Sequence, residues 1–227
     1  MHYAEYKQHD PSLVLEMVRT FPFATILANG NKGPLIAQAP LTPRIGTNSA
    51  NAVEFHLALA NPITEALVPG TPITILVQGP GAAISPSWYT ASFPGENPDR
   101  SKTAPTYNYL SLVLRGRLGL IDDQPLQKQI RDLVLASEPG DGWRTDELSP
   151  HLWDGWRKAI RGYRLEVSEF DLTAKISQGD APGDKPGVVA GLRQRGLQQD
   201  GMMARLVEEY DGTASSLHSL LNSLRVE

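Results

Sequence analysis

Residues 106–121 read TYNYLSLVLRGRLGLI, and this stretch does most to decide the fold class. Its leucines and its polar side chains fall on positions of opposite parity: Leu112, Leu114, Leu118 and Leu120, against Ser111, Arg115 and Arg117. Successive side chains of a β-strand point to opposite faces of a sheet, so this alternation is typical of a strand with one buried and one polar face. The pattern predicts a long strand over residues 106–121.

Shorter strands are predicted on both sides of this stretch. Their ranges are 23–28, 34–41, 53–59, 73–78, 82–85 and 163–167. Asn29-Gly30 follows the first of them and is a strong signal for a hairpin turn. Because the strands are mostly sequential and the helices come late, a closed antiparallel barrel is favoured over alternating βα units. The expected class is mainly β (α+β).

Helices are expected late in the chain. Asp123 and Ser149 suit the N-caps of two of them, and Trp153 and Trp156 in the second are spaced as on the packing face of a helix. Shorter helical segments are expected at 188–195, 202–210 and 217–224. The predicted organisation is a barrel domain over residues 1–175, a helical extension of it over 176–210, and a tail over 211–227 that frays.

The composition excludes several classes of function. The chain has 227 residues, 21 Lys and Arg against 25 Asp and Glu, and a net charge of −4, which does not attract nucleic acid or anionic membranes. It has no cysteine, and its five histidines are scattered, so disulfides, thiol catalysis and a metal site are not expected. No signal sequence or membrane-spanning apolar run is apparent, so the expected location is the cytoplasm.

Three segments combine aromatic rings with hydrogen-bonding groups. They are ISPSWY at 84–89, PTYNY at 105–109 and KISQ at 175–178. Together they offer a ring surface, donors and acceptors for the edge of a ring, and a cation with hydroxyls for a phosphate. This combination predicts a site for a planar, phosphorylated heteroaromatic molecule.

Each of these residues also has a purely structural interpretation. Trp88 and Tyr89 are as well explained as core or dimer-interface aromatics, and Lys175 as a solvated lysine. Thr25 is first of all a strand former. His56, the one histidine inside the candidate barrel, is better explained as a structural histidine than as a catalytic one. The residues alone leave these alternatives open.

Further short motifs accompany the three segments. They are Pro22-Phe23-Ala24-Thr25, Ala39-Pro40-Leu41, Ala60-Asn61-Pro62 and Gln78-Gly79-Pro80. With this set, residues 1 to about 210 resemble the PaiB-like family of FMN-binding negative transcriptional regulators, which has the flavin-binding split-barrel fold. The resemblance implies a six-stranded antiparallel split β-barrel with peripheral and C-terminal helices, and a homodimer that holds FMN at the subunit interface.

Carried onto this chain, the resemblance implies a cofactor site without catalytic or metal-binding residues. Its members would be Thr25, Pro40, Asn61, Ser85, Trp88, Tyr89, Tyr107, Asn108, Lys175, Ser177 and Gln178. The isoalloxazine ring is expected against Trp88 and the 107–109 segment, and the phosphate near Thr25, Lys175 and Ser177.

The chain departs from the family pattern at five positions of that motif set. It has Gln38, Leu59, Gly81, Tyr107 and Gly179 where the family has histidine, arginine, histidine, tryptophan and asparagine. The expected function is a regulatory FMN-binding protein. The alternatives are a flavin-dependent oxidoreductase or flavin reductase of low activity and a split-barrel scaffold without cofactor. DNA binding would follow from the family alone, because the charge pattern does not support it.

Overall fold

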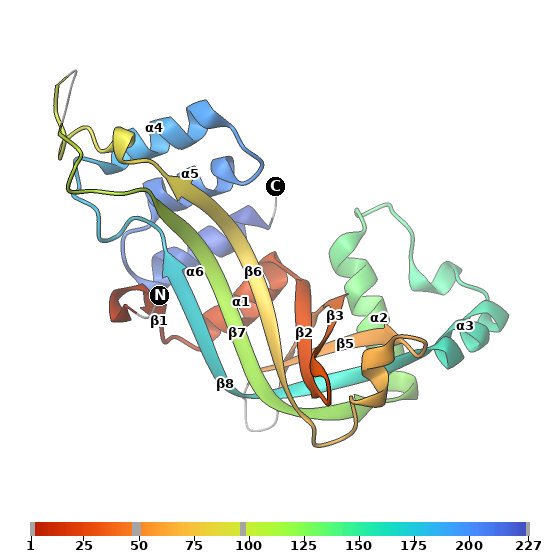
Figure 1. Ribbon diagram of the computed structural model, residues 1–227. Coiled ribbons are helices and arrows are strands. Elements are labelled where there is room, and N and C mark those ends of the chain that lie inside the picture. Colours follow the sequence, from red (N-terminus) through yellow and green to blue (C-terminus); the bar gives the residue numbers. More distant parts are fainter. Residues whose placement is uncertain (1–2, 47–50, 96–98, 226–227) are drawn as a thin grey trace. The chain divides into compact units, whose positions relative to one another are not determined.

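The computed structural model describes residues 3–46, 51–95 and 99–225 (Figure 1). Within them, the strands are β1 (Lys7–Gln8), β2 (Phe23–Gly30), β3 (Gly33–Pro40), β4 (Thr42–Ile45), β5 (Asn51–Ala58), β6 (Pro72–Ile84), β7 (Thr106–Ile121) and β8 (Ile160–Lys175). The helices are α1 (Ser12–Thr20), α2 (Asp123–Ser137), α3 (Pro150–Trp156), α4 (Lys185–Arg195), α5 (Asp200–Glu209) and α6 (Ala214–Leu224). Short 3-10 turns are η1 (Ala4–Tyr6), η3 (Pro62–Glu65), η4 (Pro86–Trp88), η5 (Thr145–Glu147) and η6 (Arg157–Ala159).

The strands form one antiparallel sheet in the order β3-β2-β6-β7-β8-β5-β4, with β1 also paired to β8. The expected α+β class is confirmed, but the described sheet has eight strands instead of six. Six of them have eight residues or more, whereas β1 and β4 have two and four. Strand β4 lies between the predicted strands 34–41 and 53–59, where no strand was predicted, and Thr42–Ile45 pairs with β5.

The described chain divides into two compact units, and the long strands β6, β7 and β8 contribute residues to both. The first unit contains the segments up to Glu16, from Gln78 to Leu112 and from Asp171 onward. The second unit contains Met17–Val77 and Val113–Phe170. The predicted domain limits at residues 175 and 210 stay a prediction.

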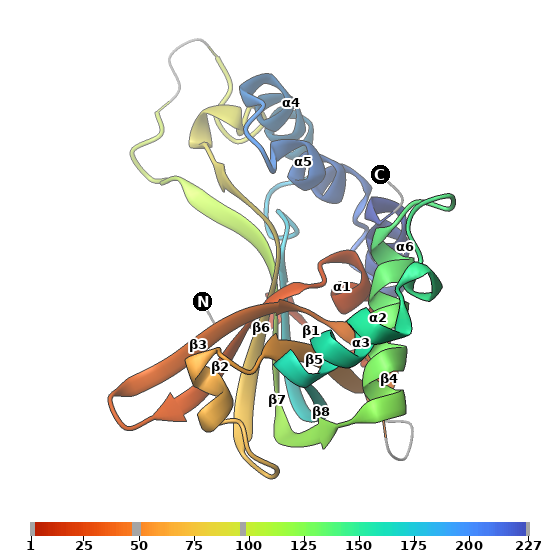
Figure 2. The same cartoon turned by 90° about the vertical axis from the view of Figure 1, so that its right-hand side faces the viewer.

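In the first unit, α4 and α5 lie side by side (Figure 2) and share an apolar core. Val188 and Leu192 of α4 and Met203 of α5 are completely buried. The last helix, α6, is also packed, because it buries Leu217, Leu220 and Leu221 in the part of the chain expected to fray. Leucines at this helical spacing provide the burial that keeps the segment folded.

Two buried carboxylates hold the ends of α4 in place. Asp200 is 2% exposed and accepts hydrogen bonds from Nε and Nη2 of Arg195 at 2.8 and 2.6 Å. Asp184 is also 2% exposed and accepts from the backbone amides of Ala91 and Ser92 at 2.8 and 2.9 Å. The bonds from Arg195 lower the pKa of Asp200 against the effect of burial. Burial raises the pKa of Asp184, but the bonds from Ser92 and Ala91 outweigh it, so that pKa is lowered too.

Acid is therefore expected to destabilise the first unit. Because both carboxylates have a lower pKa in the folded than in the unfolded chain, their contribution is complete above an ordinary aspartate pKa of about 3.9 and is lost as the pH falls through the folded values. Urea midpoints should be nearly constant from neutral pH to about pH 5 and fall below about pH 4. Asp200→Asn should cost about 1–3 kcal/mol at neutral pH and flatten the acid limb. The exposed Asp141→Asn is the control, and an equal effect of both substitutions would contradict the assignment.

The second unit contains the β2–β3 hairpin and the short strands β4 and β5. Gly30 pairs with Gly33, so the two-residue turn is Asn31-Lys32, two residues later than Asn29-Gly30 predicted. Gly33 has φ of +123°, which a glycine adopts without strain and which fixes the turn at this position. The core includes Phe55 and Tyr163, whose rings stack at 5.2 Å between centroids.

The central strand β7 has the predicted limits, and its even-numbered leucines are buried as far as Leu118. Beyond it the alternation slips by one residue, so Leu120 is 39% exposed while Ile121 is buried. A one-residue slip exchanges the two faces of a strand. The prediction that Leu120 faces the core is therefore wrong.

Strand β6 is continuous through Gly79-Pro80-Gly81, where an interruption was expected. Its pairing with β2 runs from Thr74 to Val77. A proline has no amide hydrogen to donate to a neighbouring strand. Because Pro80 lies beyond the paired stretch, β2 does not require that donor, and the strand continues.

No helix in the described part of the chain is long and apolar enough to span a membrane.

Candidate functional site

A buried polar cluster lies in the first unit, where β7 begins and β8 ends. Lys175, the last residue of β8, is 6% exposed. Its ammonium donates to the hydroxyl of Thr106 and to the carbonyl oxygen of Tyr107, the latter at 3.0 Å. It also lies 5.8 Å from the ring centroid of Tyr6. The lysine therefore joins the two strands, with an aromatic ring beside its charge.

Asn108 and Ser177 form the second part of the cluster. Asn108 is 1% exposed, and its Nδ2 donates to Ser177 Oγ at 2.8 Å. Ser177 has φ of +63°, in the left-handed region that residues other than glycine rarely adopt. Such backbone strain persists where the surrounding contacts impose it, and it is frequent at functional sites. Here it fixes the hydroxyl of Ser177 against the amide of Asn108.

Two tyrosines and an aspartate complete what we call the Lys175 cluster: Tyr6, Tyr89, Asn108, Lys175, Ser177 and Asp180. Burial, followed by Glu5, raises the pKa of Tyr6 to about 12. Burial, followed by the charge of Asp180, raises the pKa of Tyr89 to about 12. Burial lowers the pKa of Lys175, and Asp180 opposes that shift.

These groups can orient a ligand better than they can transfer protons. Phenols that stay protonated far above neutral pH donate hydrogen bonds but do not act as bases. Oδ2 of Asp180 is buried and has no hydrogen-bond partner within the described residues. A buried unpaired carboxylate oxygen is costly, so it marks a position where a donor would be stabilising. The geometry does not add a catalytic residue to the prediction.

Trp88 is in the same unit but outside this cluster. It ends η4 and packs on α4, where a side chain added at Gly191 would overlap its ring. The guanidinium of Arg195 lies 5.0 Å from the ring centroid. The indole thus has a helix and a cation as partners within the unit, which is the packing interpretation that the sequence left open.

Two other predicted site residues form hydrogen bonds with the nearby backbone. The hydroxyl of Ser85 caps η4 by accepting from the amide of Ser87 at 3.2 Å. Gln178 accepts from the amide of Ile176 at 2.8 Å and donates to the carbonyl of Ala174 at 2.6 Å. Both side chains therefore have structural partners.

Tyr107 is the most accessible ring among the predicted residues of this unit. It is 54% exposed, while its carbonyl is held by Lys175. A Cβ at Gly81 would lie 2.8 Å from the ring. Gly81 and Tyr107 replace the histidine and tryptophan of the family pattern, so the two departures are in contact: the glycine makes room for the tyrosine.

The remaining predicted residues, Thr25, Pro40 and Asn61, belong to the second unit and not to this cluster. Thr25 pairs across the β2–β3 hairpin with Gln38, one of the departures from the family pattern. Pro40 pairs with the first residue of β2. Asn61 caps η3, because its Oδ1 accepts from the amide of Ile63 at 3.2 Å.

The Lys175 cluster fits a flavin in part. Tyr107 offers a ring face, and the phenols and the Asn108–Ser177 pair offer groups for a polar ring edge. The phosphate fits less well, because the ammonium of Lys175 is buried, has two oxygen partners and lies near Asp180. A phosphate at Lys175 would have to displace one of those oxygens.

Sequence reasoning missed Tyr6, Thr106 as a partner of Lys175, and Asp180. Tyr6 is separated from Lys175 by most of the chain, and a contact of that kind leaves no trace in a local motif. Asp180 lies two residues after the KISQ segment, and it was not predicted as a site residue. The position of this acid next to a matched motif was the one available signal.

The comparison with family models identifies a family named for flavin binding. A family model described as "Putative FMN-binding domain" matches residues 1–169. This range contains Tyr89, Tyr107 and Asn108 but ends before Lys175. The chain is 23% identical over 211 residues to "Protease synthase and sporulation protein PAI 2" of Bacillus subtilis, covering 90% of this chain and 94% of that protein. It is 24% identical to "Uncharacterized protein AN0679" of Emericella nidulans, covering 87% and 92%.

Solved structures show a similar fold. The flavocytochrome Anf3 from Azotobacter vinelandii has a TM-score of 0.57 at 21% identity, covering 77% of this chain and 71% of that one. The FAD and heme binding protein from Mycobacterium smegmatis has a TM-score of 0.55 at 20% identity, covering 79% and 78%. At these identities the likeness shows the fold alone.

Proposed function

This chain belongs to the family described as "Putative FMN-binding domain", and on that premise we propose that it binds FMN non-covalently and acts as a regulatory protein. The observation that carries the proposal is the family match over residues 1–169. The chemistry of the Lys175 cluster also supports the proposal. The cluster brings neutral phenols and a fixed amide–hydroxyl pair together, and the exposed ring of Tyr107 belongs to the same compact unit.

In this proposal the flavin ring lies against the exposed face of Tyr107. Lys175 and Ser177 remain the proposed phosphate contacts in this unit. A bound flavin would supply reversible electron transfer, while the protein supplies position and polarity. The chain's own part is to hold the phenols protonated and to keep Asn108 and Ser177 in a fixed orientation.

The proposed architecture is a six-stranded split barrel that binds FMN as a homodimer. The six strands of eight residues or more, and the fold likeness at TM-scores above 0.5, support the barrel. The name of the Bacillus subtilis relative supports a role connected with protease synthesis and sporulation. Sedimentation with and without FMN tests the dimer, and a monomer under both conditions would contradict it.

The flavin site can be tested with tyrosine variants. Added FMN should lose fluorescence and gain anisotropy with the wild-type protein. Tyr107→Ala should weaken FMN binding about tenfold, since stacking of a nucleobase on an aromatic side chain contributes about 1–3 kcal/mol. Tyr3→Ala is the matched control, because Tyr3 is 59% exposed and Tyr107 is 54% exposed.

The two levels of the proposal fail separately. If the wild-type protein leaves the emission and tumbling of FMN unchanged, flavin binding is wrong for this chain. If FMN binds but both tyrosine variants bind it as tightly as the wild type, the ligand is right and the placement against Tyr107 is wrong.

A further inference from the structure

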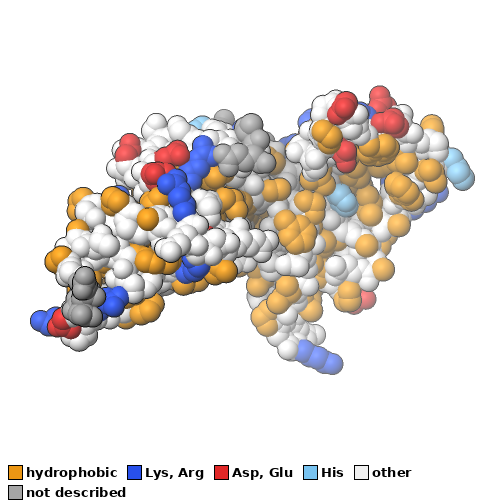
Figure 3. Space-filling view, turned by 90° about the horizontal axis from the view of Figure 1, so that it is seen from above, with side chains coloured by type: hydrophobic (Ala, Val, Ile, Leu, Met, Phe, Trp, Pro, Cys, Tyr) orange, Lys and Arg blue, Asp and Glu red, His pale blue; other side chains and the backbone are white. Residues whose placement is uncertain are grey.

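A cavity of about 560 Å³ lies within the second unit, between α2, η5, α3 and the segment that leads into β8. Three of the chain's four tryptophans line it: Trp143, Trp153 and Trp156. Figure 3 shows hydrophobic side chains gathered over the part of the molecule that carries α2 and α3. Small-molecule sites have volumes of about 300–1,000 Å³ and mostly apolar walls with a few polar groups, so the cavity has an appropriate size.

Two of the three indoles around this cavity are exposed, and Trp153 is half-buried. Trp143 and Trp156 are 40% and 57% exposed, and α3, which the structure describes completely, has no buried residue. The prediction that Trp153 and Trp156 form a packing face is therefore wrong. Large exposed apolar groups gathered at one place mark binding sites more often than solitary ones do.

One titratable ring from the sheet also lines the cavity. His56 of β5 is half-buried, and its Nδ1 lies 2.8 Å from Oε1 of Gln129. Gln129 is completely buried and donates from its Nε2 to Thr42 Oγ1 at 2.9 Å. In this orientation of the amide, its nitrogen donates to Thr42 and its carbonyl oxygen faces the imidazole, which assigns the hydrogen to Nδ1.

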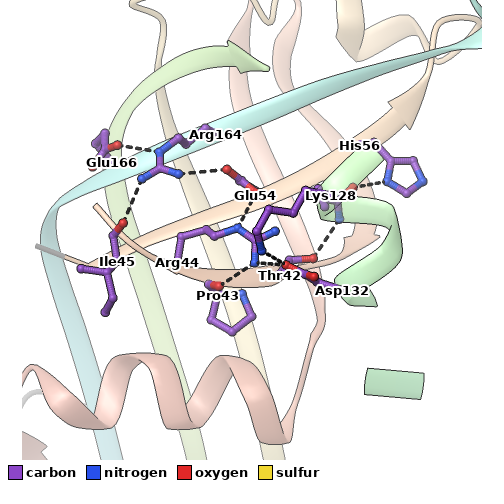
Figure 4. A network of polar contacts seen from close by, with 11 residues as sticks. Thr42, Pro43, Arg44, Ile45, Glu54, His56, Lys128, Asp132, Arg164 and Glu166 are labelled. Atoms are coloured by element: carbon purple, nitrogen blue, oxygen red, sulfur yellow. Dashed lines mark hydrogen bonds and ion pairs between the residues drawn. The ribbon is translucent and has the colours of Figure 1, made fainter. Parts of the chain in front are cut away.

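This chain of hydrogen bonds fixes the chemistry of the other ring nitrogen. In the neutral imidazole with Nδ1 protonated, Nε2 is an acceptor. No described residue donates to Nε2 of His56. Figure 4 shows the imidazole beside the ion-pair network and turned away from it. His56 therefore brings an oriented acceptor to a cavity whose other walls are largely apolar and include three indoles.

Charge restricts the class of ligand. Among the described residues that line the cavity, Asp146 is the one acid, and neither lysine nor arginine occurs. An anionic ligand would meet an acid without a compensating cation, whereas a neutral or cationic one would not. Indole faces favour flat rings, and they attract cations as well.

We propose that this cavity binds a planar, neutral or cationic heteroaromatic molecule whose N–H donates to Nε2 of His56. The tryptophans contact the faces of the ring, and Gln129 with Thr42 sets the tautomer of the histidine. The site is built from the second unit alone, so the proposal does not depend on flavin binding.

A matched pair of probes tests the hydrogen bond. Benzimidazole carries the N–H donor, and 1-methylbenzimidazole has the same ring system without it. Their dissociation constants can be measured at mildly alkaline pH from tryptophan emission and ligand-observed NMR. Benzimidazole should bind about fivefold more tightly, which is the effect of one ordinary hydrogen bond.

Variants of His56 and Gln129 test whether the histidine causes the difference in affinity between the two probes. His56→Leu should abolish the difference between the probes while both still bind, and Gln129→Leu should reduce it by releasing the imidazole. His151→Leu is the control, because His151 is an exposed histidine of α3 that does not line the cavity.

Three results would overturn the proposal. One is equal affinity of the wild-type protein for both probes, and a second is no binding of either at millimolar concentration. The third is self-association that shields the tryptophans, which would make a second copy of the chain the occupant. The probe pair acts on the wild-type protein, so a variant that fails to fold does not weaken the test.

Discussion

Gly191→Ala is expected to lower the free energy of unfolding by about 2–3 kcal/mol, the cost of overpacking a well-packed site. The added Cβ would lie 2.3 Å from two ring atoms of Trp88, far within van der Waals contact. The surrounding contacts restrict movement of the ring. Arg195 lies over it, and Gly187 lies so close to the carbonyl of Trp88 that a side chain there would overlap it. The glycines of α4 therefore allow the helix to lie close to Trp88, although alanine has the higher helix propensity.

A second glycine provides the control for this prediction. Gly201 lies in α5, and nothing stands within 4 Å of the position its Cβ would take. Gly201→Ala should therefore stabilise the protein by about 0.5–1 kcal/mol. Urea unfolding of both variants compares the same substitution in two helices. If Gly191→Ala also stabilises the protein, the packing of Trp88 on α4 is not as described.

Glu54→Gln is expected to have the largest effect, about 3–5 kcal/mol of destabilisation. Glu54 is 4% exposed and lies between two arginines, with Arg44 Nε at 2.7 Å and Arg164 Nη1 at 2.9 Å (Figure 4). Without this charge Arg44 keeps Asp132 and Arg164 keeps Glu166, but the three cations of the network, Lys128 included, then face only two carboxylates. An excess charge in a buried ionic network costs more than the network itself contributes.

Glu166 is a matched control in the same network. It pairs with Arg164 at 2.6 Å, but its side chain is 42% exposed. Water stabilises an exposed charge, so Glu166→Gln should cost at most about 1 kcal/mol. Thermal unfolding of the two variants separates the buried from the exposed partner of one arginine. Equal losses would show that burial of Glu54 does not control the energy of this network.

The fold was largely predictable where one pattern dominates. The period-2 alternation gave β7 its correct limits because that strand buries one face over most of its length. The hairpin between β2 and β3 was also expected, but its turn lies two residues further along, because Gly33 supplies the positive φ in place of Gly30. Local propensity thus located the elements, and tertiary pairing set their register.

The site was less predictable, for physical reasons that particular residues show. The motif around Trp88 did not reveal that glycines of α4, a hundred residues later, receive its indole. Nothing near Lys175 indicates that Tyr6 lies beside it, or that Ser177 adopts a left-handed backbone. The tautomer of His56 depends on Gln129 and Thr42, which occupy other elements. Such sites are assembled from distant segments, and a local pattern records only one side of each contact.

The placement of the tryptophans affects how the protein can be studied by spectroscopy. Three indoles surround one cavity of the second unit, while a single one, Trp88, belongs to the first. The intrinsic tryptophan emission therefore comes mainly from the second unit. Denaturation curves followed by that emission report chiefly on the second unit. Unfolding around α4 and α5 is better followed by circular dichroism, or in a protein in which Trp88 is the sole tryptophan.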